Sequence, residues 1–317
     1  MAVYTHLGAE ELAALIARYD VGELTSAKGI AEGVSNSNWL IETTHGRYIL
    51  TMYERRIDLD DLPYFLGLLD HLSAKGCPVP RTIHDLDGAA FRMERGKAVA
   101  LIEFLPGVSP TQPTAIQARN VGEVLARMHA ASVDFPLTRG NTMSFADNLM
   151  TLERFGEAGL AAIDTRLSAM MQPARKAAEL DLSGLPKANV HADLFPDNVL
   201  MLAGAVTGLI DFYFACYDAQ ALDLAVTHAA WCFDDRNRYR AELGEALVSG
   251  YESVRPLEAT ERAMLPEIAK GVALRFCTSR AEDWLDTPND ALVIKKDPMQ
   301  FVARWEFYDE FGAELFS

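Results

Sequence analysis

The sequence predicts an α+β protein of two lobes, an antiparallel-sheet lobe at residues 1–104 and a mainly helical lobe at 105–317. Up to about residue 104, apolar and polar residues alternate along short runs separated by turn residues, which is typical of strands joined by hairpins. From Pro113 onward, apolar residues recur at spacings of three and four, which is typical of packed helices. The change follows Leu105-Pro106-Gly107, a turn sequence.

The first lobe is expected to open with a helix over 9–19, whose apolar residues share one face. A loop of small polar residues, 31–38, lies between the first two strands and could cradle an anion with its backbone N–H groups. An ordinary surface loop would have the same composition. The remaining elements expected in this lobe are strands at 22–29, 39–43, 47–53, 80–86, 89–94 and 98–104 and an amphipathic helix at 58–75.

The second lobe is expected to be helical apart from one hairpin, Val199–Leu202 with Val206–Ile210. Val121 to Met128 carry the stripe of a buried helix face, and His129 at its end is interpreted as a core or capping residue. The other helical segments are less regular pieces over 145–180, then 219–231, 259–285 and a final helix capped by Asp297 with Pro298 at its first position.

Three oxygen-bearing side chains flank the strand-like runs around this hairpin. Asp193 lies in His191-Ala192-Asp193, Asn198 follows it by five residues, and Asp211 follows it by eighteen. Phosphoryl transfer from a nucleotide needs an acceptor for the attacking hydroxyl's proton and hard oxygen ligands for Mg²⁺. The spacing therefore indicates a phosphotransferase; the alternative is that the three residues are turn formers beside two strands.

Composition narrows the classes of partner. The formal charge of −16 disfavours nucleic acid and anionic membranes as partners but is compatible with a small zwitterionic substrate. The four cysteines are scattered in apolar contexts without a Cys-x-x-Cys pair, so they indicate buried thiols in a reducing compartment. With no signal-like N-terminus and no long apolar run, we expect a cytoplasmic location and no membrane span. The oligomeric state is not predicted.

Several stretches together resemble the bacterial homoserine kinases of the aminoglycoside phosphotransferase/choline kinase superfamily. The resemblance covers nearly the whole chain and is carried by the segments 33–39, 48–54, 191–198, 209–216 and 284–288. It implies a protein-kinase-like fold with an N-terminal nucleotide-binding lobe. It also implies ATP and Mg²⁺ as cofactors and L-homoserine as the small-molecule substrate.

The resemblance also assigns roles to residues of this sequence. Asp193 would be catalytic, Asn198 and Asp211 would hold the metal, and His191 would brace the loop. Asp223 would be a structural partner of that loop. Nucleotide binding falls to Gly33, Ser35, Asn36, Ser37, Ile49, Glu103 and Leu105, the last two through the backbone carbonyl of Glu103 and the N–H of Leu105.

Two features leave questions open. Thr51 stands where most of the superfamily has a phosphate-binding Lys, although homoserine kinases share the Thr, and Arg55 or Arg56 could supply the charge. Arg275, Arg280 and Asp283 have the chemistry to bind an amino acid's carboxylate and ammonium. Residues such as Arg275 and Asp283 are more often helix-surface charges.

Three alternatives remain at this point. The first is a kinase for another small substrate, such as choline, methylthioribose or an aminoglycoside. The second is a metal-dependent hydrolase using His191, Asp193 and Asp211, which would need further His ligands. The third is a pseudokinase that binds nucleotide without turnover.

Overall fold

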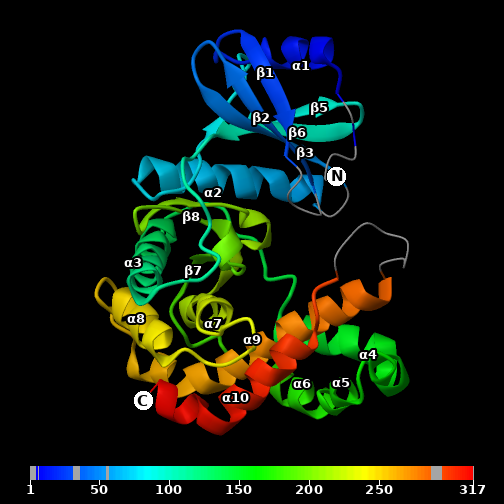
Figure 1. Cartoon of the computed structure of the whole chain (residues 1–317), viewed down its shortest axis with the longest axis vertical. Coiled ribbons are helices and arrows are strands. Elements are labelled where there is room, and N and C mark those ends of the chain that lie inside the picture. The colour runs from blue at the N-terminus through cyan, green and yellow to red at the C-terminus, as the bar shows by residue number, and fades with distance from the viewer. Residues whose placement is uncertain (1–4, 6, 31–35, 55–56, 287–294, 317) are drawn as a thin grey trace. The chain divides into compact units, whose positions relative to one another are not determined.

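The computed structural model describes residues 5, 7–30, 36–54, 57–286 and 295–316. The chain forms two compact units, which are Met1–Gly107 with Thr207–Tyr213, and Val108–Val206 with Phe214–Ser317. The first contains an antiparallel sheet and the second is mainly helical, so the predicted α+β class is confirmed (Figure 1).

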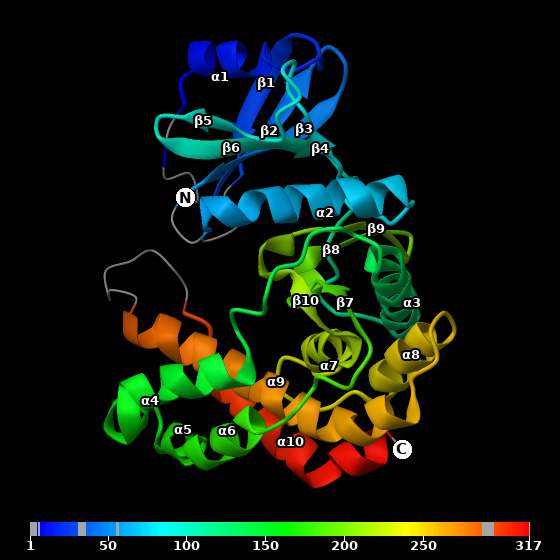
Figure 2. The same ribbon diagram turned by 180° about the vertical axis from the view of Figure 1, so that it is seen from behind.

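The first unit is built on a sheet in the order β1-β2-β3-β6-β4, with β5 paired to β6, and every pair is antiparallel. Helices α1 and α2 lie on opposite sides of this sheet (Figures 1 and 2). The bounds are α1 Ala9–Ile16, β1 Leu24–Gly29, β2 Asn36–Thr43, β3 Arg47–Tyr53, a 3₁₀ turn Leu59–Asp61, α2 Leu62–Ala74, β4 Thr82–Ile83, β5 Arg92–Glu94 and β6 Lys97–Glu103.

Strand alternation gives the sheet two different faces. On one face the strands bury apolar side chains against α1, in a core formed by Leu12, Leu15, Ile16, Tyr19, Val21, Trp39, Ile41, Leu50, Met52, Val99 and Leu101. On the other face lie the half-buried Leu40, Ile49 and Ile102, together with Thr51. This second face is therefore only partly covered by protein.

The second unit contains most of the remaining elements. The chain continues as α3 Ala115–Ser132, α4 Phe145–Ala161, α5 Thr165–Ala169, α6 Met171–Ala178, β7 Lys187–Val190, a 3₁₀ turn Pro196–Asn198, β8 Val199–Leu202, β9 Ala205–Leu209, a 3₁₀ turn Phe212–Phe214, β10 Cys216–Ala219, α7 Gln220–Trp231, α8 Ala241–Glu252, α9 Ala259–Asp286 and α10 Met299–Leu315. Strands β8 and β9 form a hairpin, as expected.

Helix α7 is the centre of the second unit (Figure 2). All of its residues are buried, because α3, α8 and α9 and the strand pair β7–β10 pack around it. Two glycines let α3 and α8 approach closely: a Cβ on Gly122 would lie 2.1 Å from the carbonyl oxygen of Leu247, and one on Gly250 would lie 2.1 Å from that of Arg119.

Two local features differ from the expectation. The short pair β7–β10 is antiparallel and frames the segment around Asp193, whereas the sequence indicated only a strand-like run there. Helix α10 begins at Met299, one residue later than expected, and Oδ1 of Asp297 accepts the Met299 N–H at 2.8 Å.

Candidate active site

The loop that follows β7 places Asp193. Ala192 has φ of 63°, a left-handed conformation that is unusual for a residue with a Cβ and costs about 1–3 kcal/mol. Such a residue persists only where its surroundings hold it. The turn after it is closed by the Phe195 N–H, which donates to the Asp193 carbonyl at 2.8 Å.

Asp223, on the buried helix α7, binds backbone N–H groups of the loop with its carboxylate. Its carboxylate accepts the His191 N–H and the Ala192 N–H, each at 2.8 Å, and Nε2 of His129 lies 3.0 Å from Oδ2. Burial alone would raise the pKa of Asp223, but the hydrogen bonds and charges from His129 and His191 outweigh it and lower that pKa. His129 is thus a core histidine, as expected.

The network extends to Tyr251, which no pattern in the sequence marks. Nδ1 of His129 lies 2.8 Å from the hydroxyl of Tyr251 on α8, which is buried. These residues are 122 positions apart, so no local spacing marks the pair. Likewise Nε1 of Trp231 donates to the Leu194 carbonyl at 2.9 Å, which secures the loop just beyond Asp193.

Asn198 is joined directly to Asp193. Its Nδ2 donates to the Asp193 carbonyl at 2.8 Å and lies 3.4 Å from Oδ2 of the Asp193 carboxylate. With the amide nitrogen used in this way, Oδ1 is the atom of Asn198 that remains suited to a cation. Asp193 itself is partly exposed, so its carboxylate can meet a molecule from solvent.

Asp211 follows β9 and belongs to the first unit. It has φ of 67° and is exposed. Burial raises the pKa of two tyrosines near it, Tyr53 on β3 and Tyr213, and the negative charge of Asp211 adds to this rise. The hydroxyls of these two tyrosines are 3.2 Å apart. Burial, with the Asp211 charge as a smaller contribution, raises the pKa of Tyr213 to about 12.

Asn198 and Asp211 each carry an oxygen of the kind that Mg²⁺ binds. Mg²⁺ takes one or two protein oxygens and completes its shell with phosphates and water, and an Asn amide oxygen or a carboxylate oxygen is a suitable donor. The hydrolase alternative requires a cluster of three or more His, Cys, Asp or Glu residues that could hold a metal, and the described residues contain no such cluster.

His191 is fully buried and accepts the Asp193 N–H through Nδ1 at 3.2 Å.

Thr51 lies on the sheet face that α1 does not cover. It is 3% exposed, and its hydroxyl donates to Oδ1 of Asn38 at 2.8 Å. The half-buried pair Lys97–Glu54 cannot supply a positive charge beside Thr51, because alternation places both side chains on the α1 side with Val99 and Met52. Arg55 and Arg56 lie outside the described residues.

The residues expected to contact nucleotide fall into three groups. Gly33 and Ser35 lie outside the described part of the chain. Asn36 and Ser37 are buried at the start of β2; Oδ1 of Asn36 has no hydrogen-bond partner among the described residues, whereas Oγ of Ser37 donates to Glu54 at 2.6 Å.

Ile49, Glu103 and Leu105 form the third group. Ile49 contributes a half-buried apolar surface beside Ile102. Glu103 ends β6 and donates its N–H to Arg81 O at 3.0 Å, and Leu105 follows it as irregular chain.

The three substrate candidates on α9 have different surroundings. Arg275 is 2% exposed and donates through Nη1 to the Ala192 carbonyl at 2.5 Å. Arg280 is tied to the start of α10, with Nη1 2.9 Å from Asp297 O and 2.6 Å from Oε1 of Gln300. Asp283 is half-buried.

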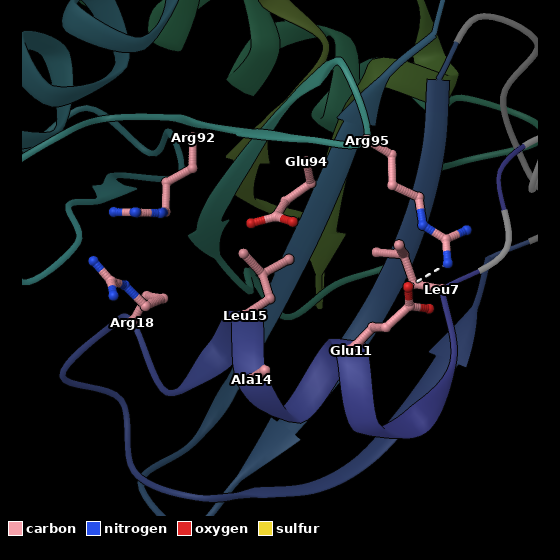
Figure 3. Close-up of a pocket in the computed structure, with 8 residues that line it drawn as sticks. All are labelled: Leu7, Glu11, Ala14, Leu15, Arg18, Arg92, Glu94 and Arg95. Carbon is pink, nitrogen blue, oxygen red and sulfur yellow. Dashed lines mark hydrogen bonds and ion pairs between the residues drawn. The ribbon is translucent and has the colours of Figure 1, made fainter.

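A shallow groove of about 330 Å³ lies elsewhere in the first unit, between α1 and β5 (Figure 3). Its three arginines are already paired: Arg18 with Asp87, Arg92 with Asp85, and Arg95 with Glu11. It lies on the α1 side of the sheet, away from the face that carries Thr51, and none of the candidate residues above lines it.

Comparison with known proteins gives the family. Residues 26–257 match the family described as "Phosphotransferase enzyme family", which is more than half of the chain. The chain belongs to this phosphotransferase family. The phosphotransferase has relatives named homoserine kinase: one from Xanthobacter autotrophicus is 45% identical over 311 residues, covering 97% of this chain and 96% of the relative. One from Sinorhizobium fredii is 47% identical over 314 residues, covering 97% and 94%.

Solved structures support the fold of this phosphotransferase. An amicoumacin kinase in complex with AMP-PNP and Ca²⁺ has a TM-score of 0.73 at 16% identity, covering 96% of this chain and 94% of that one. A microcompartment-associated aminopropanol kinase has a TM-score of 0.69 at 18% identity, covering 98% and 99%. The predicted kinase-like fold is therefore confirmed. No helix in the described ranges has the length and apolar character to cross a bilayer.

Proposed function

We propose that this phosphotransferase is a homoserine kinase, which transfers the γ-phosphoryl group of ATP to the hydroxyl of L-homoserine. The products would be ADP and O-phospho-L-homoserine, on the route to threonine. The observation that carries the proposal is the set of relatives of that name, 45–47% identical along nearly the full length of both chains. Their similarity includes the helical unit, where substrate selection is expected.

Asp193 accepts the proton of the attacking homoserine hydroxyl in this proposal. The transition state of phosphoryl transfer is loose, so orienting the hydroxyl contributes more than strong basicity does. The structure supports this role, because the loop is held at His191 and Ala192 by Asp223 and at Leu194 by Trp231. A carboxylate on such a loop is oriented before substrate arrives.

Asn198 and Asp211 supply the protein oxygens for Mg²⁺. When bound with ATP, the cation neutralises charge on the phosphates. Asn198 contributes Oδ1, because its Nδ2 is used by Asp193. Asp211 contributes an exposed carboxylate.

The nucleotide is held mainly by backbone groups and apolar surface in this proposal. The adenine would lie against Ile49 and pair with the Glu103 carbonyl and the Leu105 N–H. The loop containing Gly33, Ser35, Asn36 and Ser37 would contact the phosphates. Thr51 is neutral and hydrogen-bonded to Asn38, so it supplies no positive charge to the phosphates. The metal would therefore neutralise a larger share of the phosphate charge.

Homoserine needs a cation for its carboxylate and an anion for its ammonium. Asp283 is the candidate for the ammonium. Arg280 could serve the carboxylate only by exchanging its bonds to Asp297 and Gln300. Arg275 is too deeply buried for direct contact. We place the enzyme in the cytoplasm, with a small molecule as its partner and without nucleic acid or membrane.

The proposal is tested by ADP release with Mg²⁺-ATP and, side by side, L-homoserine, choline, methylthioribose and an aminoglycoside. We expect homoserine to give the highest kcat/KM by at least about tenfold, or 1.4 kcal/mol. A higher kcat/KM for another member of the panel contradicts the proposed substrate. ATP binding without turnover of any of the four contradicts the kinase itself and favours the pseudokinase.

A further inference from the structure

Arg275 sits against the strained point of the Asp193 loop. Its Nη1 donates to the carbonyl of Ala192, the left-handed residue, at 2.5 Å. The N–H of the same residue donates to Oδ1 of Asp223 at 2.8 Å. The two peptide groups that flank the Ala192 Cα are therefore each held, one by an anion on α7 and one by a cation on α9. The second of these peptides leads directly into Asp193.

The guanidinium is enclosed by protein on all sides. Within the described ranges it also contacts Sδ of Met143 at 3.8 Å and the rings of Phe276 and Phe214, whose centroids lie 4.8 Å and 5.8 Å away. Its Nε has no hydrogen-bond partner among the described residues. With only 2% of the residue exposed, a substrate carboxylate has no route to this guanidinium without rearrangement.

The buried charge also has an electrostatic consequence. Burial lowers the pKa of Arg275, and the negative charges of Asp193, Asp223 and Asp218, together with Cys216, act in the opposite direction. Charge complementarity with the acids around the loop therefore helps to keep a cation in this interior position.

We infer that Arg275 is a positioning residue for Asp193, which fixes the left-handed Ala192 peptide, and is not a ligand of the substrate. The inference rests on the proposed role of Asp193. It predicts that loss of the guanidinium damages the transfer step more than it damages substrate binding, because the carboxylate is displaced while the substrate's own contacts remain.

The chain offers a closely matched control in Arg304 on α10. Arg304 is 7% exposed, donates Nη1 to a backbone carbonyl, that of Ala229, at 2.6 Å, and stacks on Phe301 at 4.3 Å. Its Nε is likewise without a partner among the described residues. It differs from Arg275 in the respect under test, because the carbonyl that it holds is outside the Asp193 loop.

The experiment compares Arg275→Gln, Arg275→Lys and Arg304→Gln with the wild type by steady-state kinetics, melting temperature and hydrogen exchange of peptides spanning 190–199. We expect Arg275→Gln to lower kcat by about 10- to 100-fold, the scale of a small misplacement. The KM for homoserine should change less than about threefold, and Arg275→Lys should recover part of kcat because it keeps the charge and one donor. Exchange should accelerate in 190–199 only in the Arg275 variants.

Three outcomes would contradict the inference. A KM for homoserine that rises more than about tenfold at unchanged kcat would make Arg275 a substrate ligand. An equal loss of kcat in Arg304→Gln would make the effect one of general stability. If the hydrogen-exchange rate of peptides spanning 190–199 is unchanged in Arg275→Gln, the inference is wrong. This measurement needs no substrate, so it tests the inference even if the wild type does not phosphorylate homoserine. If Arg275→Gln does not fold, Arg275→Lys decides by the same criteria.

Discussion

At the scale of single residues, two positions adopt left-handed backbone conformations next to proposed functional groups. Ala192 precedes the catalytic residue and Asp211 is a proposed metal ligand, with φ of 63° and 67°. A residue with a Cβ pays for this conformation, although Asp and Asn tolerate it better than Ala does. The strain at Ala192 is opposed by hydrogen bonds on both of its sides.

Replacing Asp211 tests the metal assignment. Asp211→Asn keeps the shape and the tolerance for positive φ but removes the charge. We expect a loss of Mg²⁺-dependent kcat greater than the roughly 10- to 100-fold typical of losing an outer partner of a metal ligand. Stability should barely change, since Asp211 is exposed.

The matched control is Asp197→Asn, next to Asn198 and with 67% of its side chain exposed, which should leave both quantities unchanged. Wild-type kcat in Asp211→Asn at saturating Mg²⁺ would show that Asp211 is not a ligand.

The site residues that the sequence could indicate are those whose spacing is short. Asp193 and Asn198 are five residues apart, and the structure joins them by a hydrogen bond. Arg275 and Tyr251 could not be assigned in this way, because their contacts with Ala192 and His129 span 83 and 122 positions. Such contacts follow from how helices pack, which a single sequence does not specify.

At the scale of elements, the periodicity of apolar residues predicts the positions of the long strands and helices well. The predicted strand 47–53 coincides with β3, and the helix 259–285 ends within one residue of α9. The short strands β7 and β10 have four residues each, too few for an alternation pattern to stand out. They form only because they pair with each other over α7, a tertiary effect.

The contact between α3 and α8 gives a prediction at this scale. Gly122→Ala should destabilise the fold by about 1–3 kcal/mol from overpacking, although Ala is the better helix former, because its Cβ would meet the Leu247 carbonyl at 2.1 Å. Chemical denaturation measures the change.

The control for this prediction is Gly159→Ala in α4, where the nearest atom to a new Cβ, on Phe155, lies 3.6 Å away. There we expect a gain of up to about 1 kcal/mol. If both variants were stabilised, the close approach of α3 and α8 would not exist in solution.

At the scale of the whole molecule, the free energy of unfolding should depend on pH through a buried histidine. His228 is 1% exposed, with Nδ1 2.7 Å from the Tyr308 hydroxyl, and burial lowers its pKa to about 3. Its pKa when unfolded is about 6.5. Between these values the unfolded chain binds the additional proton, so His228 contributes stability above pH 6.5 that is lost as pH falls.

This linkage amounts to about 2 kcal/mol less stability from His228 at pH 5.0 than at pH 7.5. His84 acts with the opposite sign, because its hydrogen bond with Asp70 raises its pKa. Comparing the wild type with His228→Gln by urea denaturation at the two pH values isolates the His228 contribution. The variant should lose about 2 kcal/mol less than the wild type on acidification; equal losses would mean that His228 is not buried in neutral form.

The proposed activity depends most directly on Asp193 and its action on homoserine. We therefore single out the formation of O-phospho-L-homoserine, measured by mass spectrometry for the wild type and Asp193→Asn, with ATP binding followed by calorimetry. We expect one phosphohomoserine per ADP from the wild type. In Asp193→Asn, kcat should fall by about 10²- to 10⁴-fold while ATP binding changes by less than about 1.4 kcal/mol. No phosphohomoserine from a wild type that binds ATP, or full activity in Asp193→Asn, would contradict it.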